Sequence, residues 1–275
     1  MKFTKLATSI GLTIGSVLFV SNSAHAASFT SNVTQTSDGS KGDILLDSIE
    51  QNGRTINQNQ FSFVESVNSF SNTEYRGGNT GAASTDKGDL VGGMDTSEDP
   101  TKGEIASFLG DNNLNRIIDG EGRTFSMDLK FDSLIAKDDT GLDSLFFWER
   151  GMNSDLTIQG LDNKGNLIGN VMRLNRKNKE GSTQENAGFK INTLEIGGAQ
   201  EVGSWGVSLA DLGVNDLRGV RLSADSSHGG PDFKVIARRS STQEFAQAAK
   251  VPEPGTIIGL GSVAALAFFR RRKSK

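Results

Sequence analysis

Hydrophobic and polar residues alternate with a period of two through much of the middle of the chain. In TFSMDLKF (124–131), one face carries Phe125, Met127, Leu129 and Phe131. Such alternation predicts an antiparallel strand with one buried side. The stretch 155–174 predicts two more strands, joined by an Asp-, Asn- and Gly-rich turn at 162–166. Four later segments repeat the pattern: FKINTLEI, WGVSL, LRGVRLSA and DFKVIARR.

Together these segments predict about eight to ten short strands and a mainly β fold, an antiparallel β-sandwich of jelly-roll type. One or two short helices are expected at 103–119. Apolar residues recur there at helical spacing at Ile105, Phe108 and Leu109, and again from Leu114 to Ile118. Residues 27–53 are polar except for DILLDSI, which predicts a strand entering the domain. The Gly-rich acidic stretch 72–100 is expected to be a mobile loop.

The two ends of the chain predict export. Lys2 and Lys5 precede an apolar core at 10–20 and the small-residue site formed by Ala24 and Ala26. This order predicts a secretory signal peptide over 1–26; a buried first helix is the alternative. The body would then be an extracytoplasmic β-rich domain at 27–240, followed by a linker at 241–250.

The segment 251–275 predicts a short membrane anchor. A helix over the apolar run 256–269 would be about 21 Å long, short of a ~30 Å hydrocarbon core. Snorkelling arginines would extend it to a minimal span. The basic cluster that follows would hold this end in the cytoplasm, and it contains Arg270, Arg271, Arg272 and Lys273.

VPEP, an apolar helix and a basic cluster in this order resemble the PEP-CTERM sorting signal of Gram-negative, exopolysaccharide-producing bacteria. The resemblance implies that exosortase, a membrane protease, recognises Pro252, Glu253 and Pro254 and processes the tail. The two prolines agree with this role, because they keep the site extended and outside the helix. An ordinary anchor preceded by a chance Pro-Glu-Pro is the alternative. Signal peptidase and exosortase are therefore the expected processing partners, and the membrane holds the precursor.

The body carries a second resemblance. The segments 117–122 and 145–169 look like exosortase-dependent surface proteins, and 205–214 and 229–237 look like segments that recur in PEP-CTERM ectodomains. This implies a sorted surface protein with a shared extracellular domain, and it brings no catalytic residue with it.

Composition and charge narrow the chemistry. The absence of cysteine excludes disulfides, thiol nucleophiles and cysteine metal sites. The chain has a net charge of -4, and both end segments are positive, so the body is more acidic still. An acidic surface argues against nucleic acid and suits divalent cations or simple solubility.

Few residues are candidates for a catalytic site. His228 is the histidine left once His25 departs with the signal peptide, so a catalytic triad would have to include it, with Ser226, Ser227 and Asp232 nearby. No G-x-S-x-G nucleophile elbow occurs, however, and a Gly-Pro turn explains the segment more simply. A glycosidase would need two carboxylates such as Glu149 and Asp155. The simpler interpretation pairs Glu149 with Arg150 at a strand end and buries Trp148 in the core.

Two binding sites follow from short patterns. Trp205 and Tyr75 are the aromatic residues expected to stack on a glycan if they are exposed. DNNLNRIIDGEG (111–122) begins like an EF-hand loop, although Arg116 replaces the glycine and Gly122 the final glutamate. A looser structural calcium site would use Asp111, Asn113, Asp119 and Glu121.

The sequence therefore predicts a non-enzymatic exported cell-surface or matrix protein that needs no cofactor other than this structural calcium. One alternative is a carbohydrate-binding module of the exopolysaccharide matrix, and another is a surface glycosidase. Exposure of the tryptophans distinguishes these alternatives from the structural interpretation.

Overall fold

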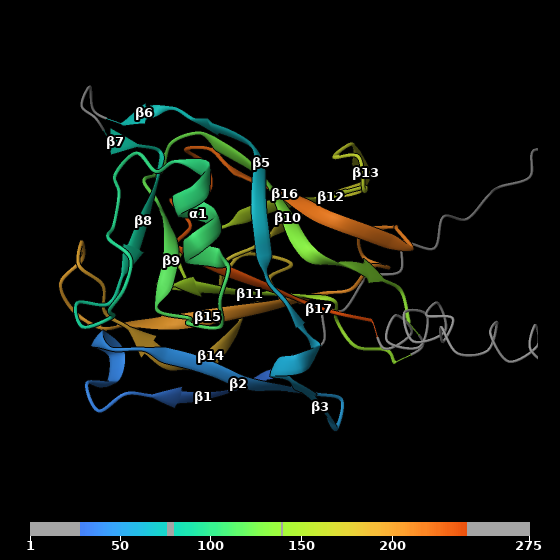
Figure 1. The fold of residues 1–275 in the computed structure, drawn as a ribbon, viewed down its shortest axis with the longest axis horizontal. Helices are drawn as coiled ribbons and strands as arrows, with labels where there is room; N and C mark the ends of the chain where they lie inside the picture. The colour runs from blue at the N-terminus through green and yellow to red at the C-terminus, as the bar shows by residue number, and fades with distance from the viewer. Residues whose placement is uncertain (1–27, 76–79, 139, 241–275) are drawn as a thin grey trace, which may run out of the picture.

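The computed structural model describes residues 28–75, 80–138 and 140–240. Its sheets are antiparallel and form three layers (Figure 1). The middle layer has seven strands. On the path β14-β15-β11-β17-β9-β8 these are Glu185–Ile191, Gln200–Val207, Leu145–Arg150, Phe233–Arg238, Arg116–Gly120 and Ala83–Lys87, and β4 (Phe61–Ser62) pairs with β17.

The outer layers cover the two faces of this sheet. One is a five-stranded sheet in the order β13-β12-β16-β10-β5, which are Leu167–Leu174, Leu156–Leu161, Asp216–Ala224, Phe125–Ala136 and Val64–Asn72. The other is the N-terminal sheet β1-β2-β3, which are Thr30–Gln35, Ile44–Gln51 and Arg54–Asn57. A small hairpin, β6 (Glu74–Tyr75) with β7 (Thr80–Gly81), and two 3₁₀ turns at Gly39–Lys41 and Gln58–Gln60 complete the β elements and turns.

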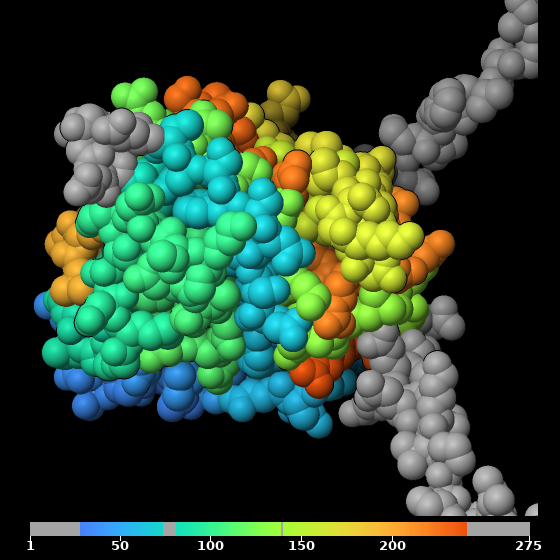
Figure 2. Space-filling model, turned by 45° about the horizontal axis from the view of Figure 1, so that its top comes forward, coloured from blue at the N-terminus to red at the C-terminus, as the bar shows by residue number. Residues whose placement is uncertain are grey.

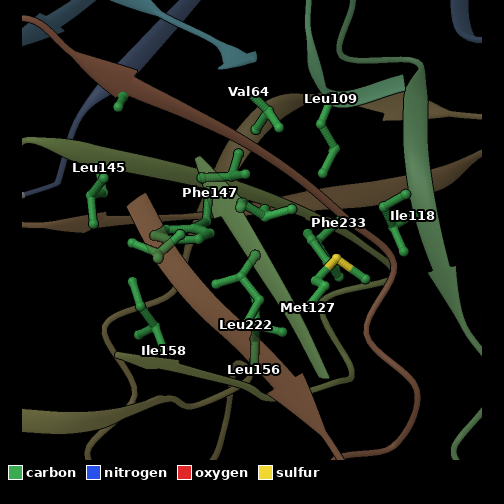
Figure 3. Close-up of a cluster of buried hydrophobic side chains, with 14 of the residues drawn as sticks. Val64, Leu109, Ile118, Met127, Leu145, Phe147, Leu156, Ile158, Leu222 and Phe233 are labelled. Atoms are coloured by element: carbon green, nitrogen blue, oxygen red, sulfur yellow. The ribbon is translucent and has the colours of Figure 1, made fainter. Parts of the chain in front are cut away.

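The larger core lies between the five- and seven-stranded sheets. Figure 3 shows side chains from both sheets meeting there, among them Met127 of β10, Phe147 of β11 and Phe233 of β17. Phe233 also stacks against Phe125, with ring centroids 6.2 Å apart. The four alternating residues predicted to face the core, from Phe125 to Phe131, are all buried. The predicted mainly β, antiparallel sandwich is confirmed.

A second core fills the space between the middle layer and the N-terminal sheet. Trp148 lies there, and its indole nitrogen donates a hydrogen bond to Ser31 Oγ at 2.9 Å. Phe29 packs edge-on against Phe146, at 4.9 Å between centroids. Strands of the middle layer are therefore apolar on both faces, as buried sheets require.

The helix α1 (Lys102–Leu109) lies against β5 and β9 and closes one side of the larger core (Figure 1). A capping box begins it: Glu104 N donates to Thr101 Oγ1, and Thr101 N donates to Glu104 Oε2. Ile105, Phe108 and Leu109 bury its inner face.

One of the one or two helices expected at 103–119 forms, as α1, whereas the expectation for the stretch before it was wrong. Residues after Leu114 form strand β9 and no second helix. Ile117 faces the second core, beside the N-terminal sheet, and Ile118 faces the larger core. The stretch 72–100 was expected to be a loop, yet it contains β6, β7 and β8, and β8 is buried except at Lys87. The predicted hairpin at 155–174 is confirmed, with Asp162 accepting backbone hydrogen bonds from Lys164 and Asn166 across the turn.

Candidate acidic site at the end of the middle sheet

Carboxylates gather at one end of the seven-stranded sheet. The strand register places Ser84 opposite Asp119 on β8 and β9, and pairs Phe233 with both Ile118 and Glu149. Phe233, Ile118 and Glu149 therefore share one face of the sheet. The residues next to them along each strand point to the opposite face. Asp232 lies just before β17. It therefore shares with Asp119 and Arg150 the face of the middle sheet that packs against the N-terminal sheet β1-β2-β3.

The Arg150 guanidinium lies among three aspartates and is itself 1 % exposed. Its Nη2 is 2.8 Å from Asp232 Oδ2 and 3.2 Å from Asp119 Oδ2. Its Nη1 is 3.4 Å from Asp86 Oδ2 and also donates to Thr193 Oγ1. One arginine thus connects β8, β9, β11 and the segment before β17.

A fourth carboxylate comes from the loop after β14. Leu194 N donates to Lys87 O at 3.0 Å, and Thr193 forms a bridge with Gly88, so this loop lies along the end of β8. Carboxylate oxygens of Asp86, Asp119 and Glu195 all lie within 4.8 Å of one another. These three residues and Asp232 form the acidic cluster. Asp86 and Asp119 are buried, whereas Glu195 lies at the exposed rim.

Crowding of acids in a desolvated place perturbs their titration. Loss of solvent and the nearby Asp119, Glu98 and Asp86 raise the pKa of Glu195 to about 9. Burial also raises the pKa of Asp86, and burial with the neighbouring Asp119 holds the pKa of Asp232 well above its usual range. Without a further positive charge, the carboxyl groups have to share protons.

A cavity of about 420 Å³ opens beside these acids. Asp119, Glu195 and Asp232 line it together with Gly120, Gly229 and Gly230. A Cβ on Gly230 would lie 2.2 Å from Gly120 O, and its φ is +77°, so only glycine fits there. The glycines therefore let the backbone pass close to the acids and leave room for solvent or a small ion.

The calcium site expected from the sequence is divided by β9. Asp111 lies before this strand, where it pairs with Lys234 at 2.9 Å and with Arg116. Asn113 Oδ1 accepts hydrogen bonds from the backbone N–H of Ile44 and Asn115. These two side chains are therefore engaged with protein groups and lie apart from Asp119, which is in the acidic cluster, and from Glu121, which lines the cavity.

The expected pairing of Glu149 with Arg150 was wrong, because consecutive residues of a strand point to opposite faces. Glu149 instead accepts a hydrogen bond from Gln184 Nε2 at 3.2 Å, and burial raises the pKa of its carboxyl group to about 8. Asp155 is also fully buried and pairs with Arg173 at 2.7 Å and Lys179 at 2.5 Å. Neither carboxylate faces solvent, where a glycosidase would need both.

His228 forms hydrogen bonds through both ring nitrogens, to Asp225 Oδ1 at 2.8 Å and to Thr157 Oγ1 at 2.9 Å. Asp232, its expected acidic neighbour, pairs with Arg150 instead. The ring therefore closes the turn before β17, as the simpler interpretation has it.

The glycan contact expected at Trp205 was also wrong. Trp205 is 1 % exposed, lies in the larger core and donates a hydrogen bond to Asn175 O at 3.0 Å. A buried indole cannot stack on a sugar ring. The backbone of Tyr75 belongs to β6, and its side chain lies outside the described residues.

Sequence reasoning missed most of the acidic cluster. Asp86 lies in a stretch expected to be a loop, and Glu195 follows a strand in an irregular segment. The one signal was the run IIDGEG, which supplied Asp119. The other carboxylates join it only through pairing among strands that are far apart in the sequence.

Comparison with protein-family models gives a match at residues 250–273, to the PEP-CTERM protein-sorting motif. The chain carries a PEP-CTERM sorting motif. No curated protein and no solved structure matches the chain. The resemblance of the central segments to exosortase-dependent surface proteins therefore stays a prediction.

The PEP-CTERM motif implies an exported, membrane-anchored precursor that exosortase processes and that is sorted to the cell surface. Pro252, Glu253, Pro254 and the basic tail lie outside the described residues, as do the signal peptide with Ala24 and Ala26, and the linker. Among the residues that are described, no helix is long and apolar enough to span a bilayer.

Proposed function

We propose that the protein is a non-enzymatic component of the cell surface or extracellular matrix of a Gram-negative bacterium. Signal peptidase and exosortase would process its two ends, and its β-rich body would act through its surface. The PEP-CTERM motif is the observation that carries this proposal.

Two features of the body support the non-enzymatic part. The carboxylates that a glycosidase would use, Glu149 and Asp155, are fully buried. The histidine that a triad would use is buried, and its Nε2 contacts Thr157 in place of the expected serine. Any contact with exopolysaccharide would have to use groups other than Trp205, because that side chain lies in the core.

The sorting proposal is tested by replacing Pro252, Glu253 and Pro254 with alanine in the full chain. We expect an uncut form that stays in the membrane fraction, because the protease loses its recognition site. Alanine replacement of Ser241, Thr242 and Gln243 in the linker is the matched control and should be processed normally. Intact mass of the native protein decides the matter: a C-terminus that still ends in RRRKSK would refute processing.

A glycan array tests the matrix partner. Purified full-length protein is applied with and without calcium, and a glycosidase assay on the same glycans runs beside it. Binding without turnover supports a matrix protein, whereas release of sugars would overturn the non-enzymatic part of the proposal.

A further inference from the structure

The acidic cluster is not used by the proposed sorting, and its geometry suits a metal ion. Oxygen atoms that bind one calcium ion lie about 2.3–2.6 Å from it, so two of them are separated by at most about 5 Å. Asp86, Asp119 and Glu195 offer oxygens within 4.8 Å of one another. The three carboxylates can therefore reach one ion from three separate segments of the chain.

The charge balance of the cluster favours an added cation. Glu98 lies beside Glu195, and Asp119 lies beside Asp232, close enough for each neighbour to raise the pKa of its partner. Five carboxyl groups thus adjoin one another, and Arg150 contributes a single positive charge that three aspartates share. Carboxyl groups this close to one another either share protons or hold a cation among them, and a bound cation lets them all ionise.

Ser84 gives an independent observation. Its side chain is fully buried, and its Oγ has no hydrogen-bond partner. It lies directly opposite Asp119 in the β8–β9 ladder and two residues before Asp86, so it points to the same face as both. A buried hydroxyl without a partner is costly because it has lost its water, and that cost disappears when its oxygen binds a cation.

We propose that Asp86, Asp119 and Glu195 bind a calcium ion that fastens the loop after β14 to the edge of the seven-stranded sheet. Ser84 adds a hydroxyl oxygen, and water from the 420 Å³ cavity completes the coordination. Hard oxygen donors and an open, irregular geometry favour calcium over magnesium, which demands a near-ideal octahedron, and over zinc, which prefers nitrogen and sulfur. This site is distinct from the EF-hand-like set, with which it shares Asp119.

Calcium binding to the full-length protein in detergent is measured by isothermal titration calorimetry after treatment with chelator. Thermal melts then follow in chelator and in up to 10 mM calcium. We expect the melting temperature to rise with calcium, because the ion binds the native state alone. Absence of both heat and melting shift over this range would overturn the proposal, as would an equal response to magnesium.

Glu195→Gln is the decisive variant, because Glu195 lies at the rim and its replacement does not disturb the buried strands. We expect calcium affinity to fall at least tenfold, while the melting temperature in chelator stays equal to that of the native chain or rises because repulsion is relieved. Glu201→Gln, which removes an exposed charge paired with Lys190, is the matched control and should bind calcium like the native chain. Unchanged affinity in Glu195→Gln would refute the site.

Protease resistance locates the ion. Calcium should protect the loop at 193–199 from limited proteolysis in the native chain and not in Glu195→Gln. Equal cleavage in chelator and calcium, with binding still seen, would place the ion elsewhere and overturn the assignment.

Discussion

Asp143 offers a direct test of how burial governs the stability of this protein. The residue lies just before β11 and is 4 % exposed. Its Oδ2 accepts a hydrogen bond from Gln51 Nε2 at 2.6 Å, and its backbone N donates to Gln51 Oε1 at 2.8 Å. Asparagine has the same shape and keeps an acceptor for Gln51, so Asp143→Asn removes the charge and little else.

The magnitude follows from linkage. Burial raises the pKa of Asp143 from 3.8 to about 6, with Asp211 adding repulsion and with Gln51 and Arg238 opposing the rise. The folded state thus holds this proton more tightly than the unfolded chain. The stability that the protonated Asp143 carboxyl group contributes is greatest at low pH and is lost as the pH rises from about 4 to 6. A shift of roughly two pKa units corresponds to a cost of about 3 kcal/mol at neutral pH.

Denaturant unfolding of the full-length protein at pH 4 and pH 8 measures the effect. We expect Asp143→Asn to be about 2–3 kcal/mol more stable than the native chain at pH 8, and to differ by less than about 1 kcal/mol at pH 4. Asp216→Asn, an exposed position on β16, is the matched control. Titration of all other groups cancels in the comparison between variant and native chain.

Two results would refute the reasoning. An equal change in unfolding free energy at both pH values would show that the charge at Asp143 is not what the folded state opposes. A variant that is less stable at pH 8 would show that the carboxylate makes a favourable contact that outweighs its desolvation.

Three further predictions concern the core. Leu129→Asp should lower the free energy of unfolding by more than about 4 kcal/mol, because it removes a fully buried side chain and introduces an unpaired charge. The control Lys130→Ala should lower it by less than about 1 kcal/mol. A soluble Leu129→Asp variant with an unchanged melting temperature would contradict this prediction. Gly219→Ala should destabilise by about 1–3 kcal/mol, since its Cβ would lie 2.1 Å from Leu129 O, while Gly197→Ala meets nothing within 4 Å and should be neutral. Acrylamide should quench tryptophan fluorescence weakly, because both indoles are 1 % exposed; strong quenching would contradict their burial.

Elements with one buried face could be predicted from the sequence. The strand at Phe125–Ala136 has solvent or polar groups on one side, so its alternation is visible, and the hairpin β12–β13 is marked by its turn residues. Strand β9 could not be predicted in the same way, because Ile117 and Ile118 are buried on opposite faces and mimic helical spacing. Strand β8 has the sequence ASTDK and no large apolar residue, so its burial left no sign in the pattern.

The candidate site was hidden for a related reason. Asp86, Asp119 and Asp232 meet because β8, β9 and β17 are neighbours in one sheet, although the chain separates them widely. Residue types alone singled out Asp119 and grouped it with Asp111, its sequence neighbour. Spatial neighbours depend on strand order, which hydrophobic periodicity does not determine.

The place of β17 in the sheet bears on when the body can fold during export. This strand is the last of the described chain, yet it lies between β11 and β9. Neither half of the sheet can join the other until Phe233–Arg238 has crossed the membrane, and the sorting motif at 250–273 follows closely behind. Closure of long-range pairings is slow and exposes strand edges while it is incomplete. An anchor at the sorting motif would therefore hold the chain at the exit site while its last strand inserts, and release by exosortase would follow completion of the fold.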